Sequence, residues 1–410
     1  MVFCLCRGRP DRTEGHLFTM RCYRVAMLAA CPFPAARGTP IRILRIAEEL
    51  ARRGHDLDVV TYHLGSDARD ALFRTHRIPN VRTYQKESPG PSYQKLLVLD
   101  PLLALKLLQN ARRKRYDVIH AHHVEGFLAA LPAARIYQLP VVFDVHTLLE
   151  SELPFYQLGL SRAVLARLGR LFDSSLPRRA DHVIAVSEEI RSTIVGRCGV
   201  DPCRVSLIPN GVEKELFPPA RPSRPGDMTD VPTVVYAGNM ASYQGVDMLL
   251  EAFAGAVCQC PSIRLRILTD GSFEPYGLLA QSLGIGGSID VRQTSLEQLP
   301  LELSAAHVAA NPRTACDGLP QKLLNYMAAG CPIVSFAGSA RHLVHEENAL
   351  IVNDGDVGAF SAAILRMVGE RDLARRLGRN AQTLVRSHMT WQHTANDIER
   401  VYERVTSAVV

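Results

Sequence analysis

The sequence contains no uninterrupted run of about 20 apolar residues, the length that crosses a bilayer as a helix. Its most apolar stretch, residues 96–108, is interrupted by Asp100, Pro101 and Lys106. The N-terminus does not resemble a secretory signal, because its apolar start is short and charged residues follow it. We therefore expect the protein to stay in the cytoplasm.

Motifs typical of cofactor and metal sites are also missing. No G-x-G-x-x-G fingerprint occurs in the first βα loop of either half, which argues against a nicotinamide-dependent enzyme. The ten cysteines are scattered, and the pairs Cys4–Cys6 and Cys258–Cys260 lack the usual spacing of zinc ligands. We expect buried free thiols rather than disulfides or a zinc centre.

Lysine is scarce: the chain has six lysines against 41 arginines, and its net charge is +6. The arginines are spread along the chain and form no single basic tract, so we expect no nucleic-acid partner. A surplus of this size is equally suited to anionic ligands or to an anionic membrane surface.

The 410 residues suit two domains of about 200 residues each. Continuous apolar runs alternate with helical patterns, which is typical of parallel sheets covered on both faces. The predicted strands are residues 24–30, 57–62, 117–122, 141–146, 182–187 and 204–209, followed by 233–238, 263–268, 306–310, 333–336 and 349–352. The predicted segments are an extension outside the fold (1–19), a first α/β domain (20–210), a proline-rich linker (211–232), a second α/β domain (233–388) and an amphipathic C-terminal helix (389–410).

The segment Arg313–Pro332 carries the strongest functional signal. Asp317 and Gly318 mark a turn between an apolar strand and a helix. Pro320 suits the first turn of that helix, and Gly330 suits its C-terminal cap. A loop in this position lies at the carboxyl end of a parallel strand, where open α/β sheets bind ligands. The helix N-terminus also offers unpaired N–H groups to an anion.

Asp317 precedes the helix, and Asn325 lies eight positions later on it. This unit resembles the retaining glycosyltransferases of family 4, whose GT-B fold has two Rossmann-like, doubly wound parallel-sheet domains facing a central cleft. In that family two glutamates occupy these positions and hold the sugar and the ribose of a nucleotide-sugar donor. The resemblance implies a catalytic role for Asp317 and a ribose contact for Asn325. It runs from about Met20 to the C-terminus and implies that the last helix crosses back onto the first domain.

The chain departs from the family where the donor diphosphate is expected. The family has an Arg and a Lys at the positions that are Asn239 and Gln244 here. A diphosphate leaving group gains charge in the transition state, so other cations must replace them. Arg313, at a strand end, and Lys322, in the first turn of the helix, are the predicted replacements. Further predicted donor contacts are the backbone N–H groups of Gly318 and Leu319 and the first loop at Gly38.

The predicted acceptor side lies in the first domain. His146 ends the strand at 141–146, and the resemblance implies that it hydrogen-bonds a sugar hydroxyl in the cleft. Arg42 is a candidate contact for an anionic acceptor, and His122 a polar group lining the cleft. Strand alternation would send His122 and His123 to opposite faces, and no acidic residue lies at metal-ligand spacing, so we expect no metal.

The leading interpretation is a metal-independent hexosyltransferase-like enzyme of glycan, lipopolysaccharide or glycolipid synthesis. It would use a nucleotide-diphosphate sugar as co-substrate, without another cofactor, and a saccharide or lipid-linked acceptor, with retention of configuration. A basic amphipathic segment at residues 159–180 suggests peripheral contact with an anionic membrane at its inner face. Two alternatives stay open: a nucleotide-sugar epimerase on the same fold, and a non-catalytic sugar-nucleotide-binding protein.

Overall fold

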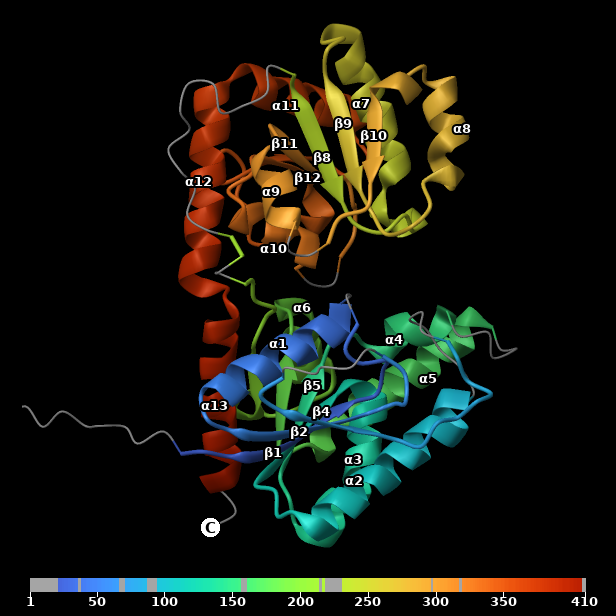
Figure 1. The fold of residues 1–410 in the computed structure, drawn as a ribbon, viewed down its shortest axis with the longest axis vertical. Helices are drawn as coiled ribbons and strands as arrows, with labels where there is room; N and C mark the ends of the chain where they lie inside the picture. The colour runs from blue at the N-terminus through green and yellow to red at the C-terminus, as the bar shows by residue number, and fades with distance from the viewer. Residues whose placement is uncertain are drawn as a thin grey trace, which may run out of the picture.

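The computed structural model describes residues 21–35, 38–65, 71–86, 94–155, 161–213, 216–217, 231–295, 298–316 and 319–407. It contains two α/β domains, one above the other in Figure 1, and each is built on a parallel sheet. The predicted extension at 1–19 and most of the predicted linker at 211–232 lie outside the described residues.

The first sheet has the strand order β3-β2-β1-β4-β5-β6-β7, with all neighbours parallel. Its strands are β1 (Arg24–Ala29), β2 (Asp56–Thr61), β3 (Arg74–Arg77), β4 (Val118–His122), β5 (Val141–Val145), β6 (His182–Ala185) and β7 (Val205–Leu207). Its helices are α1 (Gly38–Arg52), α2 (Asp100–Arg113), α3 (His123–Tyr137), α4 (Leu149–Glu152), α5 (Arg162–Ser175) and α6 (Glu188–Ser192).

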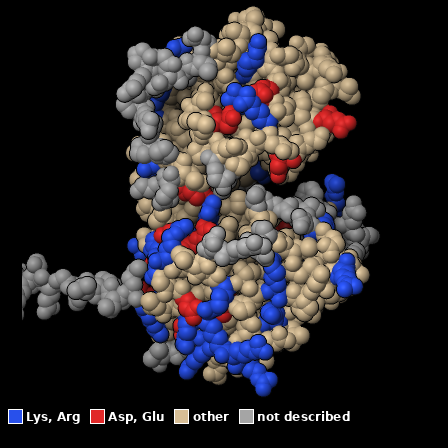
Figure 2. Space-filling model, in the orientation of Figure 1, with Lys and Arg blue, Asp and Glu red and all other residues tan. Residues whose placement is uncertain are grey.

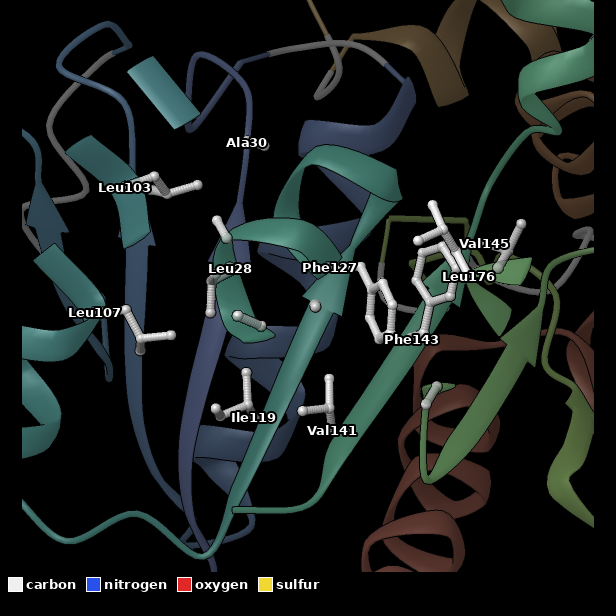
Figure 3. Packing of buried hydrophobic residues seen from close by; sticks show 14 of the residues in the cluster. Leu28, Ala30, Leu103, Leu107, Ile119, Phe127, Val141, Phe143, Val145 and Leu176 are labelled. Atoms are coloured by element: carbon white, nitrogen blue, oxygen red, sulfur yellow. The ribbon is translucent and has the colours of Figure 1, made fainter. Parts of the chain in front are cut away.

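Both faces of this sheet are covered. On one face Ala26 packs with α2 and α3 in the core shown in Figure 3, where the rings of Phe127 and Phe143 stack with centroids 4.4 Å apart. On the other face Val25 and Met27 pack with α1 and the C-terminal helix α13 (Trp391–Ser407). Burial on both sides explains why the strands are continuous apolar runs without alternation.

The second sheet has the strand order β10-β9-β8-β11-β12-β13, again parallel throughout. Its strands are β8 (Thr233–Ala237), β9 (Arg264–Leu268), β10 (Ile289–Arg292), β11 (Val308–Asn311), β12 (Ile333–Phe336) and β13 (Leu350–Val352). Its helices are α7 (Val246–Gln259), α8 (Glu274–Ser282), α9 (Leu299–Ser304), α10 (Gln321–Ala328), α11 (Val357–Gly369) and α12 (Arg371–His388).

The predicted architecture of two doubly wound parallel sheets is confirmed. The sequence did not predict β3 or β10, and both are edge strands. Their sequences, RTHR and IDVR, are rich in charge and stay partly exposed, so they lack the apolar signature of the inner strands.

The eight cysteines in the described ranges are free, but among them only Cys198 and Cys331 are buried. The expectation of buried thiols is therefore wrong for the others. Cys203, for example, is exposed because it lies in a short surface helix. Cys258 is exposed because it lies on the outer side of α7.

The two connections between the domains lie side by side. The chain leaves the first domain at Val212, whose N–H donates to the carbonyl of Met389, 3.0 Å away, on the returning segment. Gly211 directly precedes Val212, and its φ does not lie in the left-handed region. Glycine is needed there because a Cβ would lie 2.5 Å from the carbonyl carbon of Thr390.

The C-terminal helix crosses back to the first domain, as the resemblance implied. Figure 1 shows α12 along the second domain and α13 continuing onto the first. Trp391 and Tyr402 are buried in the core cluster under α1. Glu399 accepts hydrogen bonds from Arg53 and His55 at 2.9 Å each, which fastens the outer side of α13.

Candidate active site

The carboxyl ends of the two sheets face each other across the space between the domains (Figure 1), and Figure 2 shows the surface hollowed there. On the first-domain side, β4 ends at His122 and β5 ends directly before His146. On the second-domain side, β8 leads to Asn239 and β11 leads to Arg313. The topology therefore brings predicted acceptor and donor residues to facing edges.

Asp144, on β5, is the centre of a buried cluster in the first domain. It accepts a hydrogen bond from Nε of Arg42 at 3.0 Å. Its Oδ2 atom lies 3.3 Å from Nδ1 of His122 and 3.5 Å from Nε2 of His120. Burial opposes ionisation of Asp144, but the Arg42 charge and the histidine contacts hold its pKa well below the ordinary value. The cluster therefore contains one carboxylate and one guanidinium.

His146 joins this cluster from the end of β5. Its Nε2 atom lies 3.1 Å from Nδ1 of His122, and its Nδ1 atom lies 3.3 Å from the hydroxyl oxygen of Thr39 on α1. The side chain is 8 % exposed. Burial lowers the pKa of His146 well below its ordinary value, so the ring is neutral at pH 7. A substrate hydroxyl that binds His146 would replace the longer contact, that to Thr39.

The expectation that His122 and His123 point to opposite faces of a strand is wrong. The strand β4 ends at His122, and His123 begins α3 with a φ of 61°. Both rings lie against His146, with centroids 5.4 Å and 4.5 Å away. A left-handed backbone at a non-glycine residue is uncommon and often occurs at functional sites.

Arg42 is 1 % exposed, whereas its predicted role is contact with an acceptor. Besides Asp144, its guanidinium donates to the Asn210 side chain at 3.1 Å and to the Ile208 carbonyl at 2.9 Å. Arg42 thus links Asp144 to the segment that leaves the first domain. A direct acceptor contact would require it to give up these partners.

Three potential metal-ligand atoms, from His120, His122 and Asp144, lie within 4.8 Å of one another. The sequence spacing missed this group because Asp144 comes from the neighbouring strand, in register with His122. The guanidinium of Arg42 already lies on the same carboxylate, and its charge opposes a divalent cation there. The group therefore fits a metal ion poorly.

On the donor side, Lys322 contacts the position where the resembling family has its lysine. The ammonium of Lys322, on α10, donates to Oε1 of Gln244 at 2.9 Å. It also lies 4.7 Å from the centre of the Tyr236 ring. Burial, followed by the charge of Arg313, lowers the pKa of Lys322 to about 7. The protein thus holds a partly desolvated cation beside a second cation.

Arg313 and Asn239 meet at the same aromatic residue. The guanidinium of Arg313 lies 5.0 Å from the centre of the Tyr243 ring. The side chain of Asn239 donates to the Tyr243 hydroxyl at 3.3 Å and accepts from the backbone N–H of Ala241 at 3.1 Å. Asn239 therefore shapes its loop, while the exposed Tyr243 supports Arg313 beside the site.

The helix α10 provides the remaining predicted donor contacts. Its N-cap, Pro320, makes no side-chain capping bond, so no cap from the described residues occupies the first N–H groups of the helix. Asn325 is buried, and its Oδ1 atom has no hydrogen-bond partner among the described residues. Leu319 is buried directly before the helix. Asp317 and Gly318 lie outside the described residues.

Several neighbours of the predicted residues were not found by sequence reasoning. Asp144 had a signal, since it is a charged residue inside an apolar strand. Thr39, which follows the predicted Gly38 at the start of α1, and Tyr236, inside β8, had none. Tyr402 is likewise unmarked in the sequence, although its hydroxyl lies 2.8 Å from Nδ1 of His120.

Comparison with protein families gives two matches that together cover most of the chain. Residues 36–216 match Glycosyltransferase Family 4. Residues 231–370 match Glycosyl transferases group 1. Among curated relatives, the D-inositol 3-phosphate glycosyltransferase of Corynebacterium diphtheriae is 24 % identical, over 93 % of this chain and 95 % of the relative.

Solved structures with similar folds cover nearly the whole chain. Sucrose-phosphate synthase from Thermosynechococcus elongatus has a TM-score of 0.76 at 22 % identity, covering 94 % of this chain and all of that one. Anabaena HepE in complex with UDP has a TM-score of 0.72 at 17 % identity, covering 93 % of this chain and all of that one. HepE has also been solved with UDP-glucose.

Proposed function

Because the chain belongs to the family 4 glycosyltransferases of GT-B fold, we propose that it transfers a sugar from a nucleotide-diphosphate donor to an acceptor hydroxyl with retention of configuration. The observation that carries the proposal is the hydrogen bond from the Lys322 ammonium to Gln244, in the loop that follows β8. A cation there meets the charge that a diphosphate leaving group gains. The UDP bound by the structurally similar HepE supports this class of donor.

The second domain supplies three features that suit a diphosphate. Lys322 and Arg313 lie close enough for the charge of Arg313 to lower the pKa of Lys322. An anion between two cations relieves their repulsion and restores the charge that burial disfavours. The α10 N-terminus adds N–H groups and the positive end of its dipole. Among the described residues Oδ1 of Asn325 has no hydrogen-bond partner, which suits a contact with a ribose hydroxyl.

In the proposed reaction, the bond between the anomeric carbon and the diphosphate oxygen breaks. A bond from the acceptor oxygen forms on the same face of the sugar. The acceptor proton passes to the departing phosphate, so no protein base is required. His146 orients the sugar, while Lys322 and Arg313 stabilise the charge on the leaving group. Metal is not needed in this scheme, and assays with and without a chelator test that point.

The proposed function is tested in two stages. Thermal shifts with UDP, GDP and ADP identify the nucleotide, because ligands of the native state raise its stability. The matching nucleotide sugars are then incubated with and without acceptors, including D-inositol 3-phosphate and lipid-linked saccharides. Transfer that needs an acceptor supports the proposal. An epimer formed from donor alone, or binding without turnover on any acceptor, would replace it with one of the two alternatives.

The affinity for UDP is expected to depend on pH through Lys322. Its pKa of about 7 means that the ammonium is progressively lost as pH rises. Diphosphate favours the charged form, so the Kd for UDP should increase between about pH 7 and pH 9. The terminal phosphate of UDP is mostly ionised throughout this range, since phosphate monoesters have a second pKa of about 6. Isothermal titration calorimetry at several pH values provides the measurement.

The control for this titration is Lys322→Arg, because arginine keeps its charge throughout the same range. The Kd for UDP of this variant should stay nearly constant with pH. A wild-type Kd that does not change between these pH values would contradict a role for the Lys322 ammonium at the diphosphate.

We also propose peripheral contact of α5 with an anionic membrane. Among the described residues, no helix has both the length and the hydrophobicity needed to cross a bilayer. The helix α5 buries Leu165 and Gly169 against the protein, yet its outer side exposes apolar residues. These are Val164, Leu168, Leu171 and Phe172, with Arg162, Arg167 and Arg170 exposed on the same helix. An exposed apolar stripe with basic neighbours suits an anionic lipid surface.

Sedimentation with vesicles that contain phosphatidylglycerol is expected to bring down the wild-type protein at low salt and less of it at high salt. The variant Leu171→Asp/Phe172→Asp should sediment several-fold less, because it places charges on the apolar stripe. Leu278→Asp is the control, since Leu278 is a leucine on α8 of the other domain that is even more exposed than Leu171, at 80 % against 62 %. Wild-type protein that stays in solution at low salt would refute the contact.

A further inference from the structure

The hydroxyl of Tyr402 connects the C-terminal helix to the buried histidine cluster. Tyr402 lies on α13, has no exposed surface, and places its hydroxyl 2.8 Å from Nδ1 of His120. A phenylalanine would fill the same aromatic core, where Tyr402 packs edge-on against Tyr23 at 5.9 Å. Burying a hydroxyl is unfavourable unless it is hydrogen-bonded, so the contact with His120 is what the extra atom provides.

Between His120 and His146, the contacts with Asp144 decide which ring nitrogens donate and which accept. An ionised carboxylate only accepts, so the nitrogens of His120 and His122 that face Asp144 carry protons. We therefore assign Nδ1 of His120 as the acceptor for the Tyr402 hydroxyl, 2.8 Å away. Nε2 of His146, 3.1 Å from the protonated Nδ1 of His122, is likewise an acceptor.

His146 must then carry its proton on Nδ1, the nitrogen that faces Thr39 at 3.3 Å. We assign the Thr39 hydroxyl as the donor to Nε2 of His123, 2.8 Å away. The contacts therefore assign one proton position to each ring of this group, and the position on His146 depends on His122 and Asp144.

Both connections between the domains reach this cluster. The outgoing segment reaches Asp144 through Arg42, which holds the Ile208 carbonyl and the Asn210 side chain. The returning segment reaches the same carboxylate through α13, Tyr402 and His120. A group at this junction is well placed to fix the ring that faces the space between the domains.

We propose that Tyr402 is a positioning residue that fixes the tautomer and orientation of His146 through His120, Asp144 and His122. The catalytic part of this inference rests on the proposed function, whereas the tautomer assignment does not. Tyr402 itself lies behind the sheet edge and acts through other residues. Its hydroxyl should therefore affect turnover more than donor affinity.

The test is Tyr402→Phe, with Tyr23→Phe as the matched control. Tyr23 belongs to the same core cluster, but it lies outside the histidine network of the described residues. With 15N-histidine labelling, NMR of the ligand-free wild type should show His122 and His146 each in one neutral tautomer, and His120 with a proton on Nε2. In Tyr402→Phe, the signals of His120 and His146 should both shift toward mixed tautomers, and Tyr23→Phe should leave them unchanged.

In transfer assays, Tyr402→Phe should lower kcat about three- to tenfold, the range for one lost hydrogen bond, with the donor KM unchanged. His120→Phe keeps a ring, removes the same link from the strand, and should give the same change at His146. If Tyr402→Phe does not melt cooperatively, the NMR signals of His120→Phe test the proposal in its place. Unchanged His146 signals in both variants would overturn the proposal, as would equal losses of kcat in Tyr402→Phe and Tyr23→Phe. If no donor is ever turned over, the proposed function fails, but the NMR spectra still show whether Tyr402 fixes the tautomer of His146.

Discussion

Replacing Lys322 with Gln is expected to weaken UDP binding about 10- to 150-fold while leaving uridine binding unchanged. The ammonium meets only the diphosphate, and a hydrogen bond to a charged group contributes about 1.5–3 kcal/mol. Because Lys322 contacts Gln244, the two positions can be exchanged. The double variant Lys322→Gln/Gln244→Lys returns the cation to the position that the family uses, and it should recover most of the lost affinity.

Gln244→Lys alone is the informative control. It places a second ammonium beside Lys322, so it should weaken UDP binding or lower the melting temperature rather than improve either. The four proteins form a double-mutant cycle with a large coupling term. If the two substitutions change UDP affinity additively, or if wild type and Lys322→Gln bind UDP equally, the phosphates bind to other groups. Arg313→Ala, which keeps Lys322, then measures the second cation alone.

Replacing His146 with Ala is expected to lower kcat about 100-fold, the size of effect that follows when a substrate is misplaced by about 1 Å. The Kd for UDP should not change, since the donor side lies in the other domain. The neighbouring Thr147, whose hydroxyl donates to Glu152, provides Thr147→Ala as a control with normal turnover. His146→Ala that melts cooperatively and retains nearly normal kcat would remove this residue from the active site.

The inner strands could be predicted because each lies in a run of apolar residues buried on both faces. The edge strands β3 and β10 could not, since their charged side chains face solvent and carry no hydrophobic pattern. The need for glycine at position 211 could not be predicted either. It depends on Thr390, which is distant in sequence and comes close only when the returning segment is in place.

The candidate site shows the same division between local and non-local information. His146 and Lys322 were found because each lies next to a strand end or helix start that the sequence marks. The partners of Arg42 were not found, since Asp144, Ile208 and Asn210 are more than one hundred residues away along the chain. Burial of a charged side chain is decided by such partners, and a linear pattern does not contain them.

The path of the C-terminal helix has a consequence for cutting the chain. The first domain lacks one of its own covering helices, because α13, which shields Val25 and Met27, arrives from the far end of the sequence. Cleavage between Phe217 and Val231 would therefore yield two fragments that are not independent. The C-terminal fragment would carry a lone helix, α13, whose apolar side fits the other fragment. Coexpressed halves should reassemble through this helix, so the protein is a natural candidate for split-reporter complementation.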